Sequence, residues 1–216
     1  MRAVGAVVAA TDRVMAGEVD NAFCAVRPPG HHAERDRSMG FCLFSNVAIA
    51  ALYAADKYQL ERVAIVDFDV HHGNGTEDCV QHDDRILFCS TFQYPYYPGT
   101  YLPSVAGRRV NVPLAAGTGS AGFREAVETQ WLPALREFRP QLLFVSAGFD
   151  AHSEDFLAGL NLEDDDYLWV SAQLCAIARE FADGRIVSSL EGGYALDALA
   201  RSVGLHVEAL LEAGAS

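Results

Sequence analysis

The residues of this sequence that could perform chemistry begin directly after an apolar segment. Residues 62–66 are mostly apolar and β-branched, as expected of a parallel strand that is covered on both faces. Asp67, Asp69 and His71 follow at alternate positions. While the backbone stays extended, their side chains therefore point to one face. Asp150 comes just after a second apolar segment, so carboxylates and an imidazole are expected at the carboxyl ends of two strands, where open α/β sheets place their active sites.

These side chains form a ligand set for a catalytic metal ion. Asp69, His71 and Asp150 would supply two carboxylate oxygens and one imidazole nitrogen, which leaves a zinc-type ion an open position for water and substrate. A ferrous ion tolerates much the same ligands. The pattern therefore predicts the presence of a metal more strongly than its identity.

Two adjacent histidines, His31 and His32, lie in a loop that two prolines and a glycine make rigid. Beside a metal site they could relay protons, each oriented by a hydrogen bond from its second ring nitrogen. Asp67 and Asn74 are available as the orienting partners. A carboxylate partner would hold one imidazole near the charged form, whereas a neutral amide would leave the other free to begin as a base.

A fourth polar cluster ends at Tyr194, which follows two glycines and could turn its hydroxyl towards a carbonyl oxygen. Each cluster also has a structural explanation. A single aspartate at a strand end is more often a helix cap or a turn residue, and His31 and His32 could merely terminate a loop. Four clusters that each follow a predicted strand favour a catalytic site, because right-handed crossovers bring them to one edge of the sheet.

Strands that alternate with helices along the chain predict a three-layer α/β fold with a mainly parallel sheet, in a single domain of residues 1–216. A kink is expected at Pro133. The predicted strands are residues 22–26, 62–66, 85–91, 110–114, 141–147 and 185–190, and the predicted helices are residues 4–16, 43–58, 76–81, 120–138, 163–182 and 196–213.

The composition is acidic. The 216 residues include 16 Lys plus Arg and 29 Asp plus Glu, a formal charge of -13, which argues against nucleic acid or an anionic membrane as a partner. A cationic substrate would be attracted, although an acidic surface that only serves solubility explains the same charge. The five cysteines are scattered without a CxxC pair, and no segment is long enough to span a membrane. A cytoplasmic protein is the default expectation.

Taken together, these motifs closely resemble the histone deacetylase family, within the arginase/deacetylase fold. The resemblance is carried by Arg-Pro-Pro-Gly-His-His-Ala at residues 27–33, Gly-Phe-Cys at 40–42, Asp-Phe-Asp-Val-His-His-Gly-Asn-Gly-Thr at 67–76, Ser-Ala-Gly-Phe-Asp at 146–150 and Leu-Glu-Gly-Gly-Tyr at 190–194. The asparagine of His-His-Gly-Asn-Gly resembles the class II branch, which includes bacterial acetylpolyamine amidohydrolases and deacetylase-like amidohydrolases.

The resemblance implies a zinc-dependent amidohydrolase that removes acetyl or other acyl groups from acylated amines. It places Zn²⁺ on the three ligands named above and assigns proton transfer to His31 and His32, backed by Asp67 and Asn74, with Tyr194 polarising the carbonyl. It also implies a substrate channel at Gly40, Phe41, Tyr97, Gly192 and Gly193, and structural K⁺ surrounded by Asp67, Asp69, His71 and Ser90. Arginases, by contrast, use two manganese ions and an Asp-x-Asp pattern, whereas position 152 here is His.

One departure from the family concerns the N-terminus. Family members carry a substantial segment before the first helix, with a strand and loops that shape one side of the channel mouth, and the chain is expected to be truncated by comparison. The absence of this N-terminal segment should expose the apolar face of the helix at residues 4–14. An exposed apolar face is usually covered by a second copy, so we expect a homo-oligomer. The missing segment also leaves open an alternative function, a catalytically weak or inactive metal-binding protein.

Overall fold

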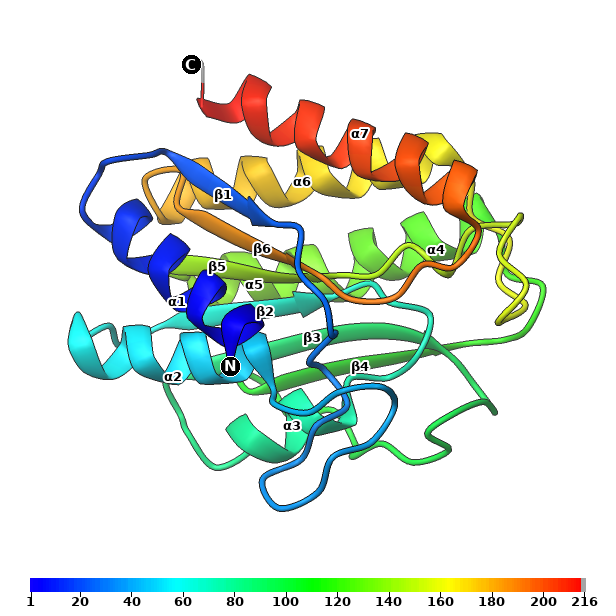
Figure 1. Cartoon of the computed structure of the whole chain (residues 1–216), viewed down its shortest axis with the longest axis horizontal. Coiled ribbons are helices and arrows are strands. Elements are labelled where there is room, and N and C mark those ends of the chain that lie inside the picture. Colours follow the sequence, from blue (N-terminus) through cyan, green and yellow to red (C-terminus); the bar gives the residue numbers. More distant parts are fainter. Residues whose placement is uncertain (215–216) are drawn as a thin grey trace.

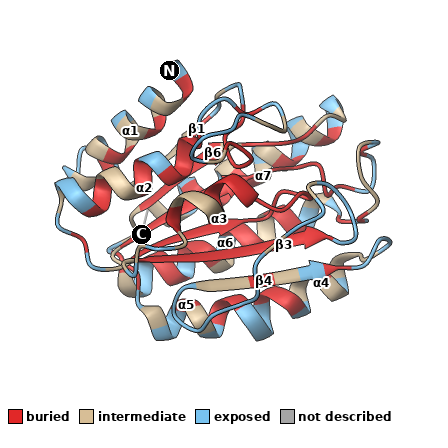
Figure 2. Cartoon of the chain, turned by 90° about the horizontal axis from the view of Figure 1, so that it is seen from below, coloured by how far each residue is buried: buried red, intermediate tan, exposed pale blue. Residues whose placement is uncertain are grey.

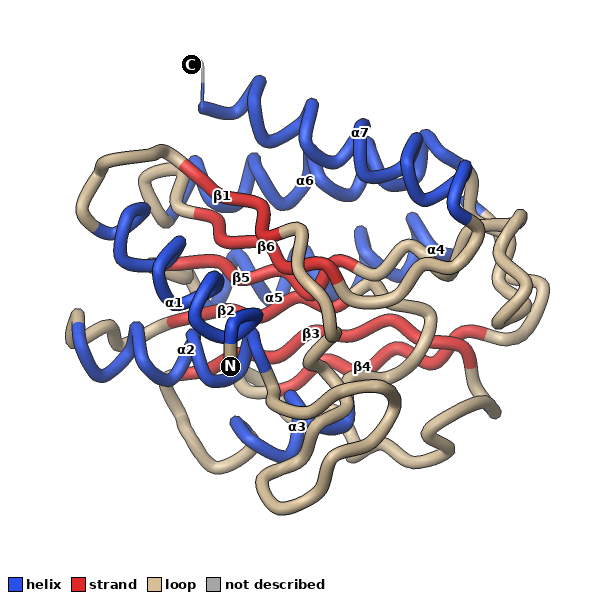
Figure 3. Tube along the Cα trace, in the orientation of Figure 1, coloured by secondary structure: helices blue, strands red, loops and turns tan. Residues whose placement is uncertain are grey.

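The computed structural model describes residues 1–214. At its centre is a six-stranded sheet whose neighbouring strands all run parallel, as Figure 1 and Figure 3 show. From one edge to the other, the strands are β1 (Asn21–Cys24), β6 (Ile186–Leu190), β5 (Leu142–Ala147), β2 (Val63–Asp67), β3 (Ile86–Gln93) and β4 (Arg109–Leu114). The predicted three-layer α/β fold is confirmed, and in the described residues the named strands pair only in parallel.

Helices cover both faces of the sheet. One face carries α1 (Arg2–Met15), α2 (Asn46–Lys57) and α3 (Asn74–Val80). The other face carries α4 (Ser120–Ala126), the π-helical turn η1 (Val127–Trp131), α5 (Leu132–Phe138), α6 (Asp164–Phe181) and α7 (Leu196–Gly214). Within residues 1–214, none of the helices has the length and hydropathy of a membrane-spanning segment.

Strand β2 shows why the sheet is buried on both sides. Val63 and Ile65 belong to the core beneath α1 and α2, whereas Ala64 and Val66 belong to the core beneath α4 to α7. Figure 2 shows the central strands as buried along their length. By the same alternation, the Asp67 side chain lies on the α2 side of the sheet, at the end of the strand. Residues that contact this carboxylate must therefore lie on the same side.

The helix predicted for residues 43–58 begins three residues late, because the preceding chain is held in a turn. Cys42 N–H donates to the Met39 carbonyl at 2.9 Å, and Phe41 has a positive φ of 64°. A residue with a positive φ lies outside the right-handed helical region, so the helix begins after it. Consequently Leu43 and Phe44 are exposed on the loop rather than packed along α2.

The helix predicted for residues 120–138 is divided by the π-helical turn η1, which ends two residues before Pro133. Proline has no N–H and its ring collides with the carbonyl four residues earlier, so an α-helix cannot pass through it undisturbed. Here the extra residue of the π turn precedes the proline, which lies in the first turn of α5.

The expected exposure of the first helix is wrong. The apolar face of α1 is covered, because Val7 and Val14 are buried against α2, β1 and β6. Exposed apolar side chains near the start of α2 include Leu43, Phe44 and Ile49.

Candidate active site

The four polar clusters meet at one edge of the sheet. The histidine loop follows β1, the Asp67 to His71 segment follows β2, Asp150 follows β5 and Tyr194 follows β6. These four strands are consecutive neighbours in the sheet. The carboxyl ends of adjacent parallel strands therefore bring together side chains that are far apart in the sequence.

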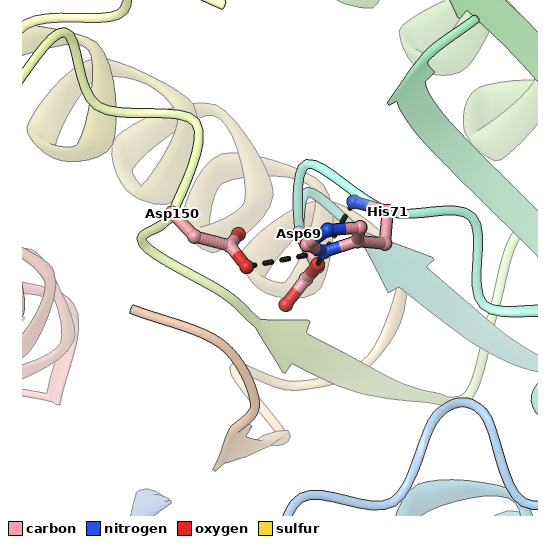
Figure 4. Close-up of side chains that lie close together, drawn as sticks. All are labelled: Asp69, His71 and Asp150. Atoms are coloured by element: carbon pink, nitrogen blue, oxygen red, sulfur yellow. Dashed lines mark hydrogen bonds and ion pairs between the residues drawn. The ribbon is translucent and has the colours of Figure 1, made fainter. Parts of the chain in front are cut away.

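Asp69, His71 and Asp150 form a buried cluster whose potential ligand atoms all lie within 4.8 Å of one another. Figure 4 shows the imidazole of His71 directed at both carboxylates. Its Nδ1 is 3.0 Å from Asp69 Oδ1 and 3.2 Å from Asp150 Oδ2. Asp150 Oδ2 is buried and accepts no hydrogen bond from a described residue. A buried carboxylate oxygen without a donor fits a cation ligand.

The remaining carboxylate oxygens of the cluster are held by backbone groups. Asp150 Oδ1 accepts from Val70 N–H at 3.0 Å, and Asp69 Oδ2 accepts from Gly192 N–H at 2.8 Å. A Cβ atom at Gly192 would lie 2.1 Å from Asp150 Oδ2, and one at Gly148 would lie 2.1 Å from Asp69 Oδ2. Only glycine can approach the carboxylates this closely, and the backbone thus fixes their orientation.

The electrostatics of the cluster also fit a divalent cation. Burial opposes protonation of His71, but the adjacent carboxylates of Asp150 and Asp69 outweigh it and raise the pKa of this imidazole to about 10. Burial, together with the charge of Asp69, raises the pKa of Asp150 to about 6. Both shifts report a strongly negative potential, which a divalent cation on the same three side chains would neutralise.

The two adjacent histidines each contact the partner that the sequence made available. His31 Nδ1 is 2.9 Å from Asp67 Oδ2, and His32 Nδ1 is 2.8 Å from Asn74 Oδ1. Both imidazoles are buried, with ring centroids 4.0 Å apart.

Glu34 settles the tautomer of His32. Its carboxylate accepts a hydrogen bond from Asn74 Nδ2 at 2.7 Å, so the amide oxygen of Asn74 must face the imidazole. His32 Nδ1 therefore carries the proton, and Nε2 is left with a free lone pair. This is the form in which an imidazole can begin as a base.

The pKa values of the two histidines are shifted in opposite directions. Burial opposes a charge on His31, but the carboxylates of Asp69 and Asp67 outweigh it and raise its pKa well above the ordinary value. Burial and the charge on His31 lower the pKa of His32 to about 2. The two pKa shifts are opposite in direction, the asymmetry expected from one carboxylate partner and one amide partner.

An open cavity of about 380 Å³ lies over the cluster. Its walls are largely aromatic: Tyr97 stands edge-on to His32 with centroids 5.0 Å apart, and Tyr96 stacks on His71 at 5.7 Å. The lining residues are Pro29, His31, His32, Gly40, Phe41, His71, Tyr96, Tyr97, Leu157, Gly192 and Tyr194.

Of the five residues predicted for the substrate channel, Gly193 is the one that does not line the cavity. A Cβ atom at this position would meet Leu199 and Phe149 instead, because the residue has φ of +132° and turns away from the opening. Alternation along an extended chain could not reveal this turn.

The structure brings together only some of the side chains predicted to surround K⁺. Ser90 is the sheet partner of Asp67, which brings these two residues side by side. The Ser90 hydroxyl, however, lies 3.3 Å from Nδ1 of His72, and the His71 imidazole belongs to the metal cluster. A K⁺ site remains a prediction.

Sequence reasoning missed several residues that hold the site together. Glu191 is fully buried, and its Oε2 accepts from the backbone N–H groups of Gly30 at 2.6 Å and His31 at 3.1 Å. Glu191 belongs to the Leu-Glu-Gly-Gly-Tyr motif quoted above. Its position at the end of an apolar strand could have identified it as a residue of the site. Glu34, Tyr96 and Leu157 carried no comparable signal, because their roles depend on loop conformation.

Comparison with known proteins agrees with this geometry. The family defined by the histone deacetylase domain matches residues 1–210. The chain belongs to the histone deacetylase family. It is 42% identical over 235 residues to type-2 histone deacetylase 2 of Dictyostelium discoideum, covering 98% of this chain and 14% of that protein. It is 42% identical over 197 residues to the histone deacetylase-like amidohydrolase of Pseudomonas aeruginosa, covering 88% of this chain and 52% of that protein.

A solved structure supports the fold. The HD domain of HDA15 superposes with a TM-score of 0.90 and 34% sequence identity, covering 98% of this chain and 62% of that one. The histone deacetylase family resemblance and its arginase/deacetylase fold are thereby confirmed. The chain spans about half the length of several curated relatives, such as 52% of the Pseudomonas protein and 56% of a probable deacetylase of Archaeoglobus fulgidus.

Proposed function

We propose that this histone deacetylase family member is a metal-dependent amidohydrolase that removes an acetyl or related acyl group from an acylated amine. The observation that carries the proposal is the convergence on one cavity of a buried ligand cluster, a histidine pair and a tyrosine. Zn²⁺ is the metal that we propose, since two carboxylates and one imidazole leave it an open position, and Fe²⁺ is the alternative.

Asp69, His71 and Asp150 would hold the ion, which supplies Lewis acidity to the acyl carbonyl and to water. Amide hydrolysis by water yields a carboxylic acid and an amine, so a proton must move from the attacking water to the departing nitrogen. His32 presents the free Nε2 lone pair that accepts the proton from water, and the histidine pair returns a proton to the amine as the C–N bond breaks.

Tyr194 lines the same cavity as the histidines and would donate its hydroxyl proton in a hydrogen bond to the developing oxyanion. Burial raises the pKa of this hydroxyl above its ordinary value, so the group stays protonated and remains a donor. Such a donor contributes on the order of a hundredfold to turnover.

The shape of the cavity supports a substrate with a narrow, apolar stem. Phe41 and Tyr97 flank the opening, and aromatic walls of this kind suit the methylene chain of an acyl-lysine or an acylpolyamine. The acidic charge of the chain favours a cationic substrate. A cytoplasmic location agrees with five free cysteines.

A panel of N-acetylated and longer N-acylated lysine peptides and polyamines, assayed with the metal-loaded chain and with the chelated chain, tests the proposal. We expect amine release from at least one substrate class, dependent on the metal. The Tyr194→Phe variant should bind the same amount of metal and turn over at least about a hundredfold more slowly. Stoichiometric metal binding without turnover of any substrate would instead support the inactive metal-binding alternative.

A further inference from the structure

Asp155 lies in the loop between β5 and α6 and is only 6% exposed. Both of its carboxylate oxygens accept hydrogen bonds from backbone N–H groups. Oδ2 accepts from Tyr194 at 2.7 Å and from Ala195 at 3.0 Å, and Oδ1 accepts from Leu157 at 3.0 Å. One buried carboxylate thus binds the backbone of the tyrosine and the backbone of the cavity wall at Leu157.

The role of this carboxylate is not explained by the metal cluster or by an ion pair. Asp155 does not line the cavity, and within residues 1–214 no basic side chain forms an ion pair with it. Its neighbour Glu154 provides a contrast, because that side chain is exposed and pairs with Arg201. Burying a charge is costly unless several donors compensate it, and here the donors belong to the tyrosine segment.

Apart from Asp155, a contact that holds the backbone beside Tyr194 comes from Arg27, whose Nη2 donates to the Gly193 carbonyl at 3.1 Å. Gly192 and Gly193 precede Tyr194, and the latter glycine has φ of +132°. Within the described chain, no residue forms a hydrogen bond with the Tyr194 hydroxyl. Its ring lies beside Phe41 and Phe156, at centroid distances of 6.3 and 6.5 Å, and these side chains are 73% and 76% exposed. The Arg27 guanidinium carbon lies 5.9 Å from the centroid of the same ring.

We propose that Asp155 is a positioning residue that fixes the Tyr194 hydroxyl over the metal cluster by binding the backbone of Tyr194 and Ala195. The proposal rests on the deacetylase function proposed above, in which that hydroxyl stabilises the oxyanion. A backbone hydrogen bond at the root of the side chain determines where its far end lies. A displacement of about 1 Å can cost on the order of a hundredfold in rate.

The kinetic test uses the metal-loaded chain and its Asp155→Ala variant. We expect kcat to fall by at least about tenfold, because the hydroxyl is no longer held in place, while KM changes by less than about threefold. Asp155→Asn retains one oxygen acceptor for the tyrosine segment and should recover part of the loss. Glu154→Ala, the matched control in the same loop, should retain the natural kcat.

A double variant separates positioning from general damage. If Asp155 acts through the tyrosine hydroxyl, adding Asp155→Ala to Tyr194→Phe should lower kcat by less than about twofold beyond Tyr194→Phe alone. The same loss in both backgrounds, or a loss of bound metal in Asp155→Ala, would overturn the proposal.

Hydrogen–deuterium exchange tests the contact independently of activity. The amides of Tyr194 and Ala195 should exchange at least about tenfold faster in Asp155→Ala than in the natural chain, whereas Glu154→Ala should leave them unchanged. A natural chain without deacetylase activity would refute the proposed function, and with it the role of Asp155 in turnover. Unchanged exchange in Asp155→Ala would refute the positioning of the tyrosine segment, whatever the activity.

Discussion

His206 allows a quantitative prediction of how stability depends on pH. Its imidazole is buried in α7, between Ser171 Oγ at 2.6 Å from Nδ1 and Ser188 Oγ at 2.8 Å from Nε2. The Ser171 hydroxyl donates to the Tyr167 carbonyl at 2.5 Å, so it can only accept from the imidazole. Nδ1 therefore carries the proton, and Nε2 accepts from Ser188. The neutral ring is satisfied, and a second proton would have no acceptor without rearranging Ser188.

Burial lowers the pKa of His206 from 6.5 to about 4. The unfolded chain therefore takes up a proton at a higher pH than the folded chain, and stability is lost as pH falls from about 6.5 towards 4. Each unit between the two pKa values corresponds to about 1.36 kcal/mol of unfolding free energy. Protonation of His206 across the whole range therefore lowers the unfolding free energy by about 3 kcal/mol. About 2 kcal/mol of this should be lost between pH 8 and pH 5.

Denaturant unfolding of the natural chain and of His206→Gln at pH 8 and pH 5 measures this contribution. The variant should be less stable at pH 8, but the difference in unfolding free energy should shrink by about 2 kcal/mol at pH 5. Groups common to both proteins cancel in the comparison. His82→Gln, which removes an exposed imidazole, is the matched control. Parallel stability curves for the natural chain and His206→Gln would refute the argument.

Three further predictions concern the site and the surface. Asp150→Ala removes one of three ligands and should sharply reduce bound zinc by elemental analysis; full zinc content would contradict the ligand assignment. Gly192→Ala places a Cβ atom 2.1 Å from Asp150 Oδ2 and should weaken zinc binding at least about tenfold by competition titration, and unchanged affinity would refute the close packing. Leu43, Phe44 and Ile49 are exposed together, so the chain should self-associate in light scattering at micromolar concentration and Phe44→Glu should reduce this; a natural monomer would contradict the expectation.

The fold could be predicted from the sequence because its strongest signals are local. Each parallel strand is an apolar run flanked by turns, and each helix has an apolar face. The metal cluster followed from the same information, because Asp69, His71 and Asp150 stand directly after strands whose carboxyl ends must meet. The partners of His31 and His32 were also available, since Asp67 and Asn74 flank the metal ligands in one motif.

Features that depend on loop conformation could not be predicted. Asp155 reaches Tyr194 across 39 residues, and Glu34 reaches Asn74 across 40. Neither contact follows from spacing, because both loops are irregular. The apolar face of α1 was wrongly predicted to be exposed because the family's N-terminal segment was expected to cover it. This face instead packs on α2, β1 and β6, a tertiary contact that the sequence alone does not reveal.

The segment from Glu191 to Tyr194 makes a different contact at each residue. Glu191 binds the backbone of the histidine loop, Gly192 N–H donates to Asp69, the Gly193 carbonyl accepts from Arg27 at 3.1 Å, and Tyr194 N–H donates to Asp155. One short stretch of backbone thereby joins the proposed proton-transfer groups, a proposed metal ligand and the proposed oxyanion donor. Such a connection is thermodynamically reciprocal. If a ligand that displaces Tyr194 weakens metal binding, the bound metal must oppose that displacement by the same factor.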